Sequence, residues 1–390
     1  MPTYETAIAS YSPPADNQVT PPGDILLNSV EPDAGVTPVV EFLQSAKASI
    51  DISTYRIDSD FTAVVDPLAQ AAANGIPVRI SISRQLVGQP NPPEGNATQL
   101  KQAEALRARG LQVELSRPEF HYGHEKSITI DAGTSNGKVM VSDWNLQASY
   151  FGPNSYGPVG ARGFAVVDSN PDDVAMIAAY FNANWPPYTD WPVSNRASLL
   201  WSPSGVGFSP VGNSITDMKS FVKNSKKTLD IYAEMIQDDS FILAEVIDRA
   251  KAGVRVRVIA NSSGQSAAVV ESLRKAGAEV VFDPSNASAP DAVMFVHSKS
   301  MVADYGAGDQ VAFVGSQNQF INESLEAILE LGTWVKDPKS IETIHNTFNT
   351  DFSRSTSTQA SPSPSTATSP STSTAVSAST SPAASASSGN

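Results

Sequence analysis

Two short polar segments of this sequence repeat the same residue types at the same spacing. Residues 124–131 read His-Glu-Lys-Ser-Ile-Thr-Ile-Asp, and residues 297–304 read His-Ser-Lys-Ser-Met-Val-Ala-Asp. Side chains two positions apart on an extended chain point to the same side, so the histidine and lysine of each segment should emerge together. An asparagine follows each histidine by 21 positions, at Asn145 and Asn318. This equal spacing predicts equivalent places for the two amides.

Together, these residue types could cleave a phosphodiester. Two imidazoles facing each other across the phosphorus could act in turn, one attacking it and one protonating the departing alcohol. Histidine suits both tasks because its pKa lies near neutrality. Two lysines would supply fixed positive charge, and two asparagine amides would donate hydrogen bonds to the phosphate oxygens. We therefore expect no metal ion and no cofactor, and the four histidines form no obvious metal-binding motif.

The paired motifs resemble the phospholipase D superfamily, whose signature is His-x-Lys-(four residues)-Asp followed by a Gly-Ser-x-Asn strand, normally present twice per active site. The likeness covers roughly residues 24–352. It implies that His124 is the nucleophile that forms a phosphohistidine. It also implies that His297 is the general acid, and then the base that activates water or an alcohol. The motif aspartates, although counted with the catalytic set, are expected to orient and pair within the structure rather than touch substrate.

The family also carries a glutamate downstream of the asparagine, which holds a catalytic histidine by a hydrogen bond. Glu330 matches that place in the second half, whereas Gly163 stands there in the first half, which leaves the orienting of one histidine open. Asp143 replaces the usual serine beside the first asparagine, and its carboxylate could repel the phosphate, pair with a cationic head group or point away. The predicted catalytic residues are His124, Lys126, Asp131, His297, Lys299, Asp304 and Glu330, and the predicted substrate-binding residues are Asn145, Asn318 and Ser316.

The segments that must position these side chains also repeat, which indicates a duplicated domain. Residues 48–53 and 227–232 alternate like matching strands, and each is followed by a helical pattern that stops at a glycine before a β-branched strand. A second helix end and glycine come next, at residues 106–110 and 273–277. We therefore predict an α/β fold of two pseudo-symmetric halves, each a mixed, largely parallel sheet flanked by helices, with the active site at their interface.

The two ends of the chain differ in composition from the part between them. Residues 1–23 are proline-rich and are predicted to be an extended lead-in, and residues 24–195 and 196–353 are the two predicted halves. Residues 354–390 are almost entirely Ser, Thr, Ala and Pro, a composition that predicts a disordered tail. This tail could be a stalk or a wall-spanning spacer, or an overhang without a role.

Composition narrows the class of protein. A hydrophobic fraction of 41% over 390 residues supports folded cores, and a net charge of −14 argues against strong nucleic-acid binding. There is no cysteine, and no apolar run reaches membrane-spanning length. The N-terminus shows no signal peptide, so either the protein is not exported by that route or the signal has been removed. We expect a secreted or cell-surface protein, with a cytoplasmic one as the alternative.

These observations predict a phospholipase D-type phosphodiesterase that hydrolyses phosphatidyl groups or transfers them to alcohols. We expect it to be a monomer whose partners are its phospholipid or other phosphodiester substrate and, transiently, a membrane surface. One alternative is a nuclease of the same chemistry, and another is a non-catalytic phosphate- or lipid-binding protein. The aromatic loop at residues 150–158 could form a rim that meets acyl chains, or could pack the seam between the halves.

Overall fold

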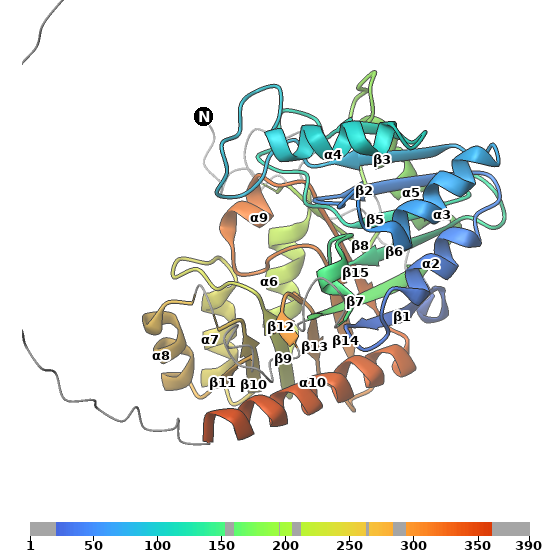
Figure 1. Cartoon of the computed structure of the whole chain (residues 1–390). Coiled ribbons are helices and arrows are strands. Elements are labelled where there is room, and N and C mark those ends of the chain that lie inside the picture. The colour runs from blue at the N-terminus through green and yellow to red at the C-terminus, as the bar shows by residue number, and fades with distance from the viewer. Residues whose placement is uncertain are drawn as a thin grey trace, which may run out of the picture.

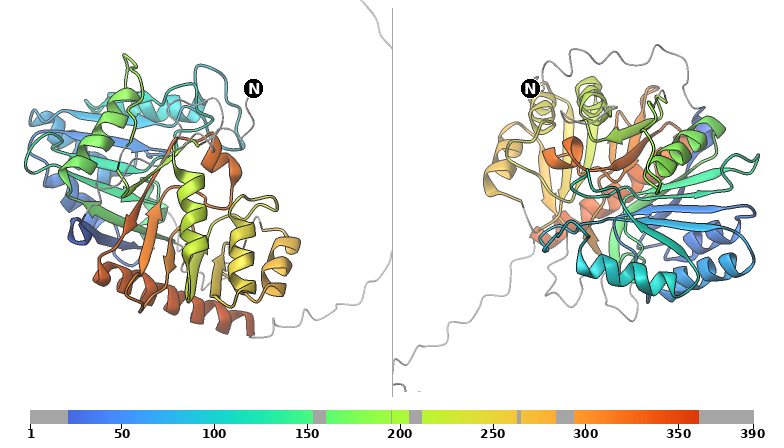
Figure 2. Two further views of the ribbon diagram at one scale, coloured as in Figure 1. Left: turned by 180° about the vertical axis from the view of Figure 1, so that it is seen from behind. Right: turned by 90° about the horizontal axis from the view of Figure 1, so that it is seen from above.

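Two β-sheets with helices packed against them make up the protein. The computed structural model describes residues 21–152, 160–194, 196–204, 212–262, 265–283 and 294–360. The sheets meet in the middle of the molecule, and the long helix α10 (Pro338–Ala360) runs beneath strands of both halves (Figures 1 and 2). Most of the predicted lead-in, the loop residues 153–159 and the chain after residue 360 lie outside the described residues.

The first half begins with a short 3₁₀ turn and ends with a helix that is followed by the connection to the second half. Its elements are η1 (Pro22–Asp24), β1 (Ile25–Glu31), α2 (Thr37–Gln44), β2 (Ile50–Thr54), α3 (Thr62–Ala73), β3 (Val78–Ile82), α4 (Ala97–Arg107), β4 (Gln112–Leu115), β5 (Ser127–Ile130), β6 (Lys138–Ser142), η2 (Ala148–Tyr150), β7 (Gly160–Asp168) and α5 (Pro171–Ala183).

The second half repeats this order and closes with α10. Its elements are β8 (Leu199–Ser202), α6 (Ser214–Asn224), β9 (Thr228–Ala233), α7 (Leu243–Lys251), β10 (Arg255–Ala260), α8 (Ala267–Lys275), β11 (Glu279–Phe282), β12 (Met294–Val296), β13 (Met301–Ala303), β14 (Val311–Gly315), α9 (Asn322–Glu326), β15 (Glu330–Val335) and α10.

The repeated glycines end matching helices in the two halves. Gly75 after α3 has φ +86°, and Gly253 after α7 has φ +88°. A residue without a Cβ atom adopts this left-handed conformation at little cost, so the chain can turn sharply from the helix into the next strand. The strands that follow, β3 and β10, pair in parallel with β2 and β9. The helix, glycine and strand pattern of the sequence is therefore confirmed.

The two sheets share one strand order, which confirms the duplication. The first runs β1-β7-β6-β5-β2-β3-β4, with β12 added beside β7, and the second runs β8-β15-β14-β13-β9-β10-β11. Within each of these orders the first four pairings are antiparallel and the last two are parallel. The mixed sheets are confirmed, although their parallel part is smaller than predicted. β5 leads directly into β6 by a tight connection, and such neighbours run antiparallel.

Each half extends a segment across the interface to pair with the other half. β12, from the second half, pairs in parallel with β7 of the first half. The counterpart in the first half is a parallel bridge between Gly123 and Leu329. A shared core lies behind these crossings and includes Val141, Phe164, Val314 and Leu331. The two halves therefore form one packed unit around their interface.

Helix α10 packs against this unit and continues past residue 354, where the disordered tail was predicted to start. The buried Arg162 of β7 donates from Nε to Asp351 of α10 at 2.6 Å, which ties the helix to the first half. The helix continues to Ala360, and Ser355 on it is fully buried. Packing of this helix face extends the fold past the last charged residue. No helix in the described part of the chain is long and apolar enough to cross a membrane.

Candidate active site

The motif histidines lie just before strands rather than on them. Strand β5 begins at Ser127, directly after Lys126, and strand β13 begins at Met301, two residues after Lys299. The bridge from Gly123 to Leu329 places the next residue, His124, beside Glu330. In the same way, the parallel pairing of Val296 with Arg162 places His297 beside Gly163. Thus the glycine, and not an acid, stands opposite the second histidine.

His124 is held by an acid from the other half. Its Nδ1 atom lies 3.0 Å from Oε2 of Glu330, and the Lys126 Nζ donates to the His124 carbonyl oxygen at 2.8 Å. Burial, with Lys126, Lys299 and His297 nearby, holds the pKa of His124 well below its usual range. When Nδ1–H of the neutral ring donates to Oε2 of Glu330, an oxygen that can accept even if the other carboxyl oxygen carries a proton, the lone pair of Nε2 stays available for attack.

His297 has different neighbours. Its Nε2 lies 3.6 Å from Oε1 of Glu234, and the Lys299 Nζ lies 3.2 and 3.3 Å from the two ring nitrogens. Lys299 also forms an ion pair with Glu234 and donates to the His297 carbonyl oxygen at 2.5 Å. Burial lowers the pKa of His297 to about 3, and Glu234 opposes that shift. Both lysines thus bond the carbonyl of their own histidine, as equivalent residues would.

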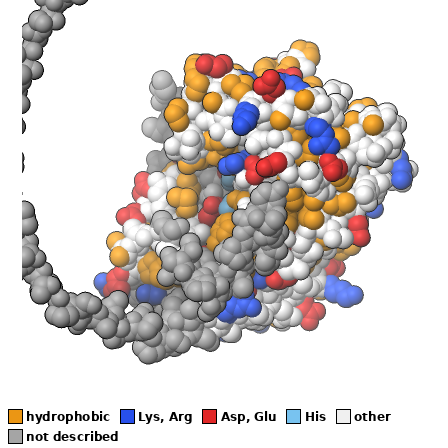
Figure 3. Space-filling view, viewed as in Figure 1, with side chains coloured by type: hydrophobic (Ala, Val, Ile, Leu, Met, Phe, Trp, Pro, Cys, Tyr) orange, Lys and Arg blue, Asp and Glu red, His pale blue; other side chains and the backbone are white. Residues whose placement is uncertain are grey.

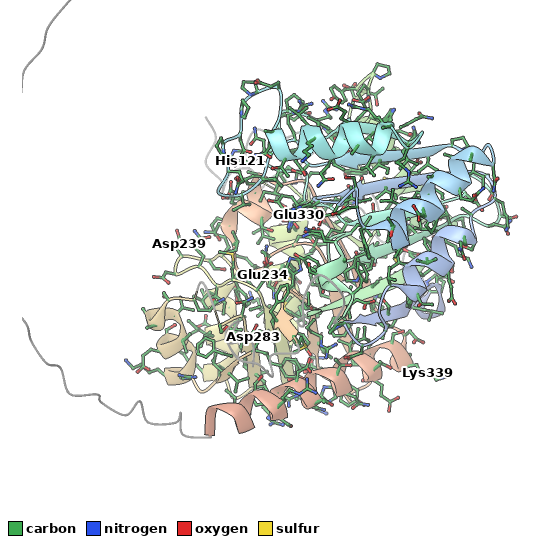
Figure 4. The ribbon with its side chains drawn as sticks, viewed as in Figure 1. His121, Glu234, Asp239, Asp283, Glu330 and Lys339 are labelled. Carbon is green, nitrogen blue, oxygen red and sulfur yellow. The ribbon has the colours of Figure 1, made fainter. Side chains whose placement is uncertain are left out.

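The carboxyl groups of the site differ in charge. Burial raises the pKa of Glu330 to about 8, even though Lys126 opposes it. Burial would also raise the pKa of Glu234, but His297 and Lys299 outweigh it and lower that pKa to about 2. Glu234 is therefore the ionised acid at neutral pH, while Glu330 largely keeps its proton. Figure 4 shows both side chains in the middle of the molecule, between the halves.

The site lies in a hollow between the halves. In the space-filling view a small area of histidine atoms is visible there, with basic and acidic side chains beside it (Figure 3). A tyrosine ring packs edge-on against each imidazole, with the ring centroids 4.9 Å apart: Tyr55 against His124, and Tyr150 against His297. Tyr150, the first residue of the predicted aromatic loop, therefore belongs to the site; residues 153–158 of that loop are outside the described residues.

The side chains of the two asparagines and of Ser316 differ in their contacts, and substrate binding by all three stays a prediction. The side-chain oxygens of Asn145 and Asn318 are buried and have no hydrogen-bond partner in the described part of the chain, and Nδ2 of Asn145 donates to the Tyr150 hydroxyl at 3.0 Å. The Ser316 hydroxyl is fully buried, accepts from the Leu331 N–H and donates to the Leu331 carbonyl, both at 3.2 Å. Strand β15 takes up this hydroxyl, and Ser316 lies against Glu330 and His124 in the site.

The motif aspartates hold chain turns and do not face the histidines. The Asp131 carboxylate accepts hydrogen bonds from the backbone N–H groups of residues 47–49, and Asp304 accepts from those of residues 226–228. Each lies at the far end of the strand that follows its lysine, about 16 Å along the chain. Their place in the catalytic set is corrected: they pair within the structure, as the resemblance itself implied.

The Asp143 carboxylate is turned toward strand β7 and is bonded there. It is fully buried, and its Oδ1 accepts a hydrogen bond from the Phe164 N–H at 2.9 Å. A Cβ atom on Gly163 would lie 2.4 Å from that same oxygen. Burial raises the pKa of Asp143 to about 6, against the opposing charge of Lys299. Asp143 thus fills the space over Gly163, and the structure favours the third of the alternatives given for it.

Sequence reasoning missed Glu234 and Tyr55 as members of the site, and it offered Tyr150 only as part of a loop that could form a rim or pack the seam. Positions 55 and 234 are equivalent in the duplication, because each comes two residues after the repeated strand segments. Extending that alignment beyond the strands could have found both. Two other histidines stay outside the site, as expected: His121 pairs with the exposed Glu323 at 2.7 Å, and His345 lies 2.9 Å from Asp230.

Comparison with known proteins identifies the family. The sequence matches the family model described as "Cardiolipin synthase, PLD-like domain" over residues 39–185 and 218–352, one stretch in each half. The chain belongs to the phospholipase D superfamily. No curated protein matches this phospholipase D-like chain in a sequence search.

Two solved structures resemble this phospholipase D-like fold. Phosphatidylserine synthase from Haemophilus influenzae Rd KW20 matches with a TM-score of 0.60 and 12% identity over 86% of this chain and 87% of that one. Polyphosphate kinase from Porphyromonas gingivalis matches with a TM-score of 0.60 and 17% identity over 83% of this chain and 50% of that one. The chain thus spans half the length of the kinase, and identities this low show the fold alone.

Proposed function

We propose that this protein is a phospholipase D-type phosphodiesterase that works through a phosphohistidine. The observation that carries the proposal is the pairing of two histidine–lysine units, one from each half, in one buried site. His297 lies close enough to His124 to lower its pKa, and each of the two lysines lowers the pKa of both imidazoles. A site that collects two imidazoles and two cations suits an anion that must be attacked on one side and released on the other.

In the first step of the proposed reaction, Nε2 of His124 forms a bond to phosphorus while the bond from phosphorus to the leaving alcohol oxygen breaks. The phosphate anion favours the protonated ring of His297, which gives its proton to that oxygen. In the second step, His297 takes a proton from water or an acceptor alcohol, whose oxygen attacks phosphorus as the P–N bond breaks. Lys126 and Lys299 offset the phosphate charge throughout, which burial makes more effective than in water.

A phosphatidyl substrate is the one we favour. Tyr55, Tyr150 and Phe295 lie beside the histidines, with their rings against the imidazoles or each other, and could meet an apolar group next to the phosphate. The matching family model is described for cardiolipin synthase, and one similar structure is a phosphatidylserine synthase, which supports a lipid substrate. The net charge of −14 disfavours a long polyanion. Secretion, a monomeric state and transient membrane contact remain predictions.

A substrate panel tests this proposal. Phosphatidylcholine, phosphatidylethanolamine, phosphatidylglycerol, single-stranded DNA and a soluble diester would be assayed with a chelator present, with and without an added primary alcohol. We expect release of the head group, and a phosphatidyl-alcohol product when alcohol is present. Cleavage of DNA but of no lipid would favour the nuclease, and no turnover together with tight lipid binding would favour the non-catalytic alternative. His124→Ala and His297→Ala should each remove most turnover, and the double variant should lose little more.

A further inference from the structure

The two histidines are not held alike, although the halves are duplicates. His124 is next to Glu330, while the equivalent neighbour of His297 is Gly163, which has no side chain. The space above Gly163 is filled by Asp143, which the Phe164 N–H binds. No hydrogen bond joins the Asp143 carboxylate to the His297 ring among the described residues; the Asp143 backbone carbonyl bonds to that ring instead, as does Lys299. His297 therefore needs another acid if it is to be held as His124 is.

Glu234 stands where such an acid is needed. It directly follows β9, and its Oε1 lies 3.6 Å from Nε2 of His297 while its other carboxylate oxygen pairs with Lys299. Its backbone is fixed as well, because the Glu234 carbonyl oxygen accepts from Gln265 at 2.8 Å. The side chain is one-quarter exposed and lies between the halves (Figure 4). At the equivalent place in the first half is Tyr55, so this acid belongs to one half only.

We propose that Glu234 is the positioning residue of His297: it acts on the Nε2 side of the ring and through Lys299, whereas Glu330 acts on Nδ1 of His124. The proposal rests on the proposed function, in which His297 delivers and recovers a proton. Glu234 binds Lys299 with one oxygen and faces the imidazole with the other, so it fixes the lysine and the ring relative to each other. Its negative charge also favours the protonated ring that must give its proton to the leaving oxygen, against the two lysines that disfavour it.

Glu234→Gln is the first test, on two soluble diesters with the same phosphate group and different leaving groups. We expect kcat to fall about 10- to 100-fold, the range found when the carboxylate that orients a metal-binding histidine is removed. KM should change less than threefold. The pattern of loss across a poor and a good leaving group should match that of His297→Ala and not that of His124→Ala. Adding Glu234→Gln to His297→Ala should cost less than threefold more.

The matched control is Glu323→Gln. This change removes the carboxylate from another Glu–His pair, that of the exposed Glu323 and His121, which lies at the rim and outside the site (Figure 4). We expect less than a twofold change on both diesters. A loss in Glu234→Gln that is equal for both leaving groups and adds fully to His297→Ala would overturn the proposal, and so would a loss no larger than that of the control.

A second test moves the acid. The pair Asp143→Ser and Gly163→Glu copies the second-half arrangement of Ser316 and Glu330 into the first half, and removes the oxygen that a Cβ at position 163 would meet. In a Glu234→Gln background, this double change should restore kcat at least tenfold, because an acid again faces His297. If the triple variant has the melting temperature of the native protein and still recovers no activity, then Glu234 does not act by positioning His297.

A measurement without substrate separates this inference from the proposed function. The ring nitrogens of the four histidines can be followed by ¹⁵N NMR at pH 7 and assigned with single histidine variants. Glu234→Gln should move the His297 nitrogens and leave those of His124 in place, and Glu323→Gln should move those of His121 alone. Unmoved His297 signals would contradict the positioning role. A native protein that cleaves no diester, but whose His297 signals respond as expected, would instead refute the proposed function.

Discussion

Replacing Asp304 by alanine should damage the stability of the protein and spare its chemistry. The Asp304 carboxylate accepts from the N–H groups of Lys226, Lys227 and Thr228 at 2.9, 2.6 and 3.2 Å. A hydrogen bond to a charged group contributes about 1.5–3 kcal/mol. The three bonds to Asp304 share one carboxylate, and Lys226 is open to water, so their contributions do not add fully and we expect a combined loss of about 2–4 kcal/mol. Asp304 also has φ +54°, where alanine costs about 1 kcal/mol more.

The expected total for Asp304→Ala is thus about 3–5 kcal/mol in the free energy of unfolding. Asp304→Asn keeps one acceptor oxygen and tolerates the positive φ, so it should lose about 1–2 kcal/mol. Urea unfolding followed by tryptophan fluorescence would measure both. At a temperature where each variant is folded, kcat on a soluble diester should stay within about twofold of the native value.

Asp131→Ala is the internal replicate of this test, because Asp131 binds the N–H groups of residues 47–49 in the same way and has φ +53°. If either alanine variant lost activity as severely as His297→Ala while its unfolding free energy stayed native, then the aspartate would act in the chemistry. The assignment of both aspartates to chain turns would then be wrong.

Two further predictions concern buried acids. Glu330→Gln should slow formation of the phosphohistidine roughly 100-fold or more, because the variant loses the acid that fixes the tautomer of His124. A single-turnover rate equal to that of the native protein would contradict the role of the 3.0 Å contact between His124 Nδ1 and Glu330 Oε2. Burial raises the pKa of Glu31 to about 8, so the folded state binds a proton that the unfolded state releases above its ordinary carboxyl pKa. This contribution to the free energy of unfolding is full below about pH 4.5 and is lost as the pH rises to about 8. Urea unfolding over this pH range should show a smaller loss of stability for Glu31→Gln than for the native protein. An identical pH profile in the two proteins would show that Glu31 ionises normally.

The site was predictable from sequence where the duplication repeats residue types at fixed spacing. His124, His297 and their lysines could be found because side chains two apart on an extended chain share a face. Glu330 could be found only through the family resemblance, since it is distant in sequence from the histidine that it holds. The fold was predictable to the level of two helix-flanked mixed sheets, because glycine stops and β-branched strands are local signals.

The rest depended on pairings between the halves. Whether Asp143 faces the phosphate is decided by the Phe164 N–H on the neighbouring strand, and no pattern around residue 143 indicates it. Glu234 approaches His297 from a separate strand, so its role follows from tertiary contact. The edge strands β1 and β8 were missed because they are joined to their sheets only by distant partners, β7 and β15. These antiparallel additions also explain why the parallel share was overestimated.

The central claim is that His124 becomes covalently bonded to phosphorus during turnover. The direct measurement traps the covalent intermediate. The native protein is mixed with a ³²P-labelled diester and quenched with alkali, because phosphohistidine is labile in acid, and the labelled histidine is located by peptide mass spectrometry. We expect label on the peptide containing His124, none in His124→Ala, and accumulation in His297→Ala when the leaving group is good enough to need no acid. Turnover in which no labelled histidine forms at any time point, or label on His297 alone, would contradict the account.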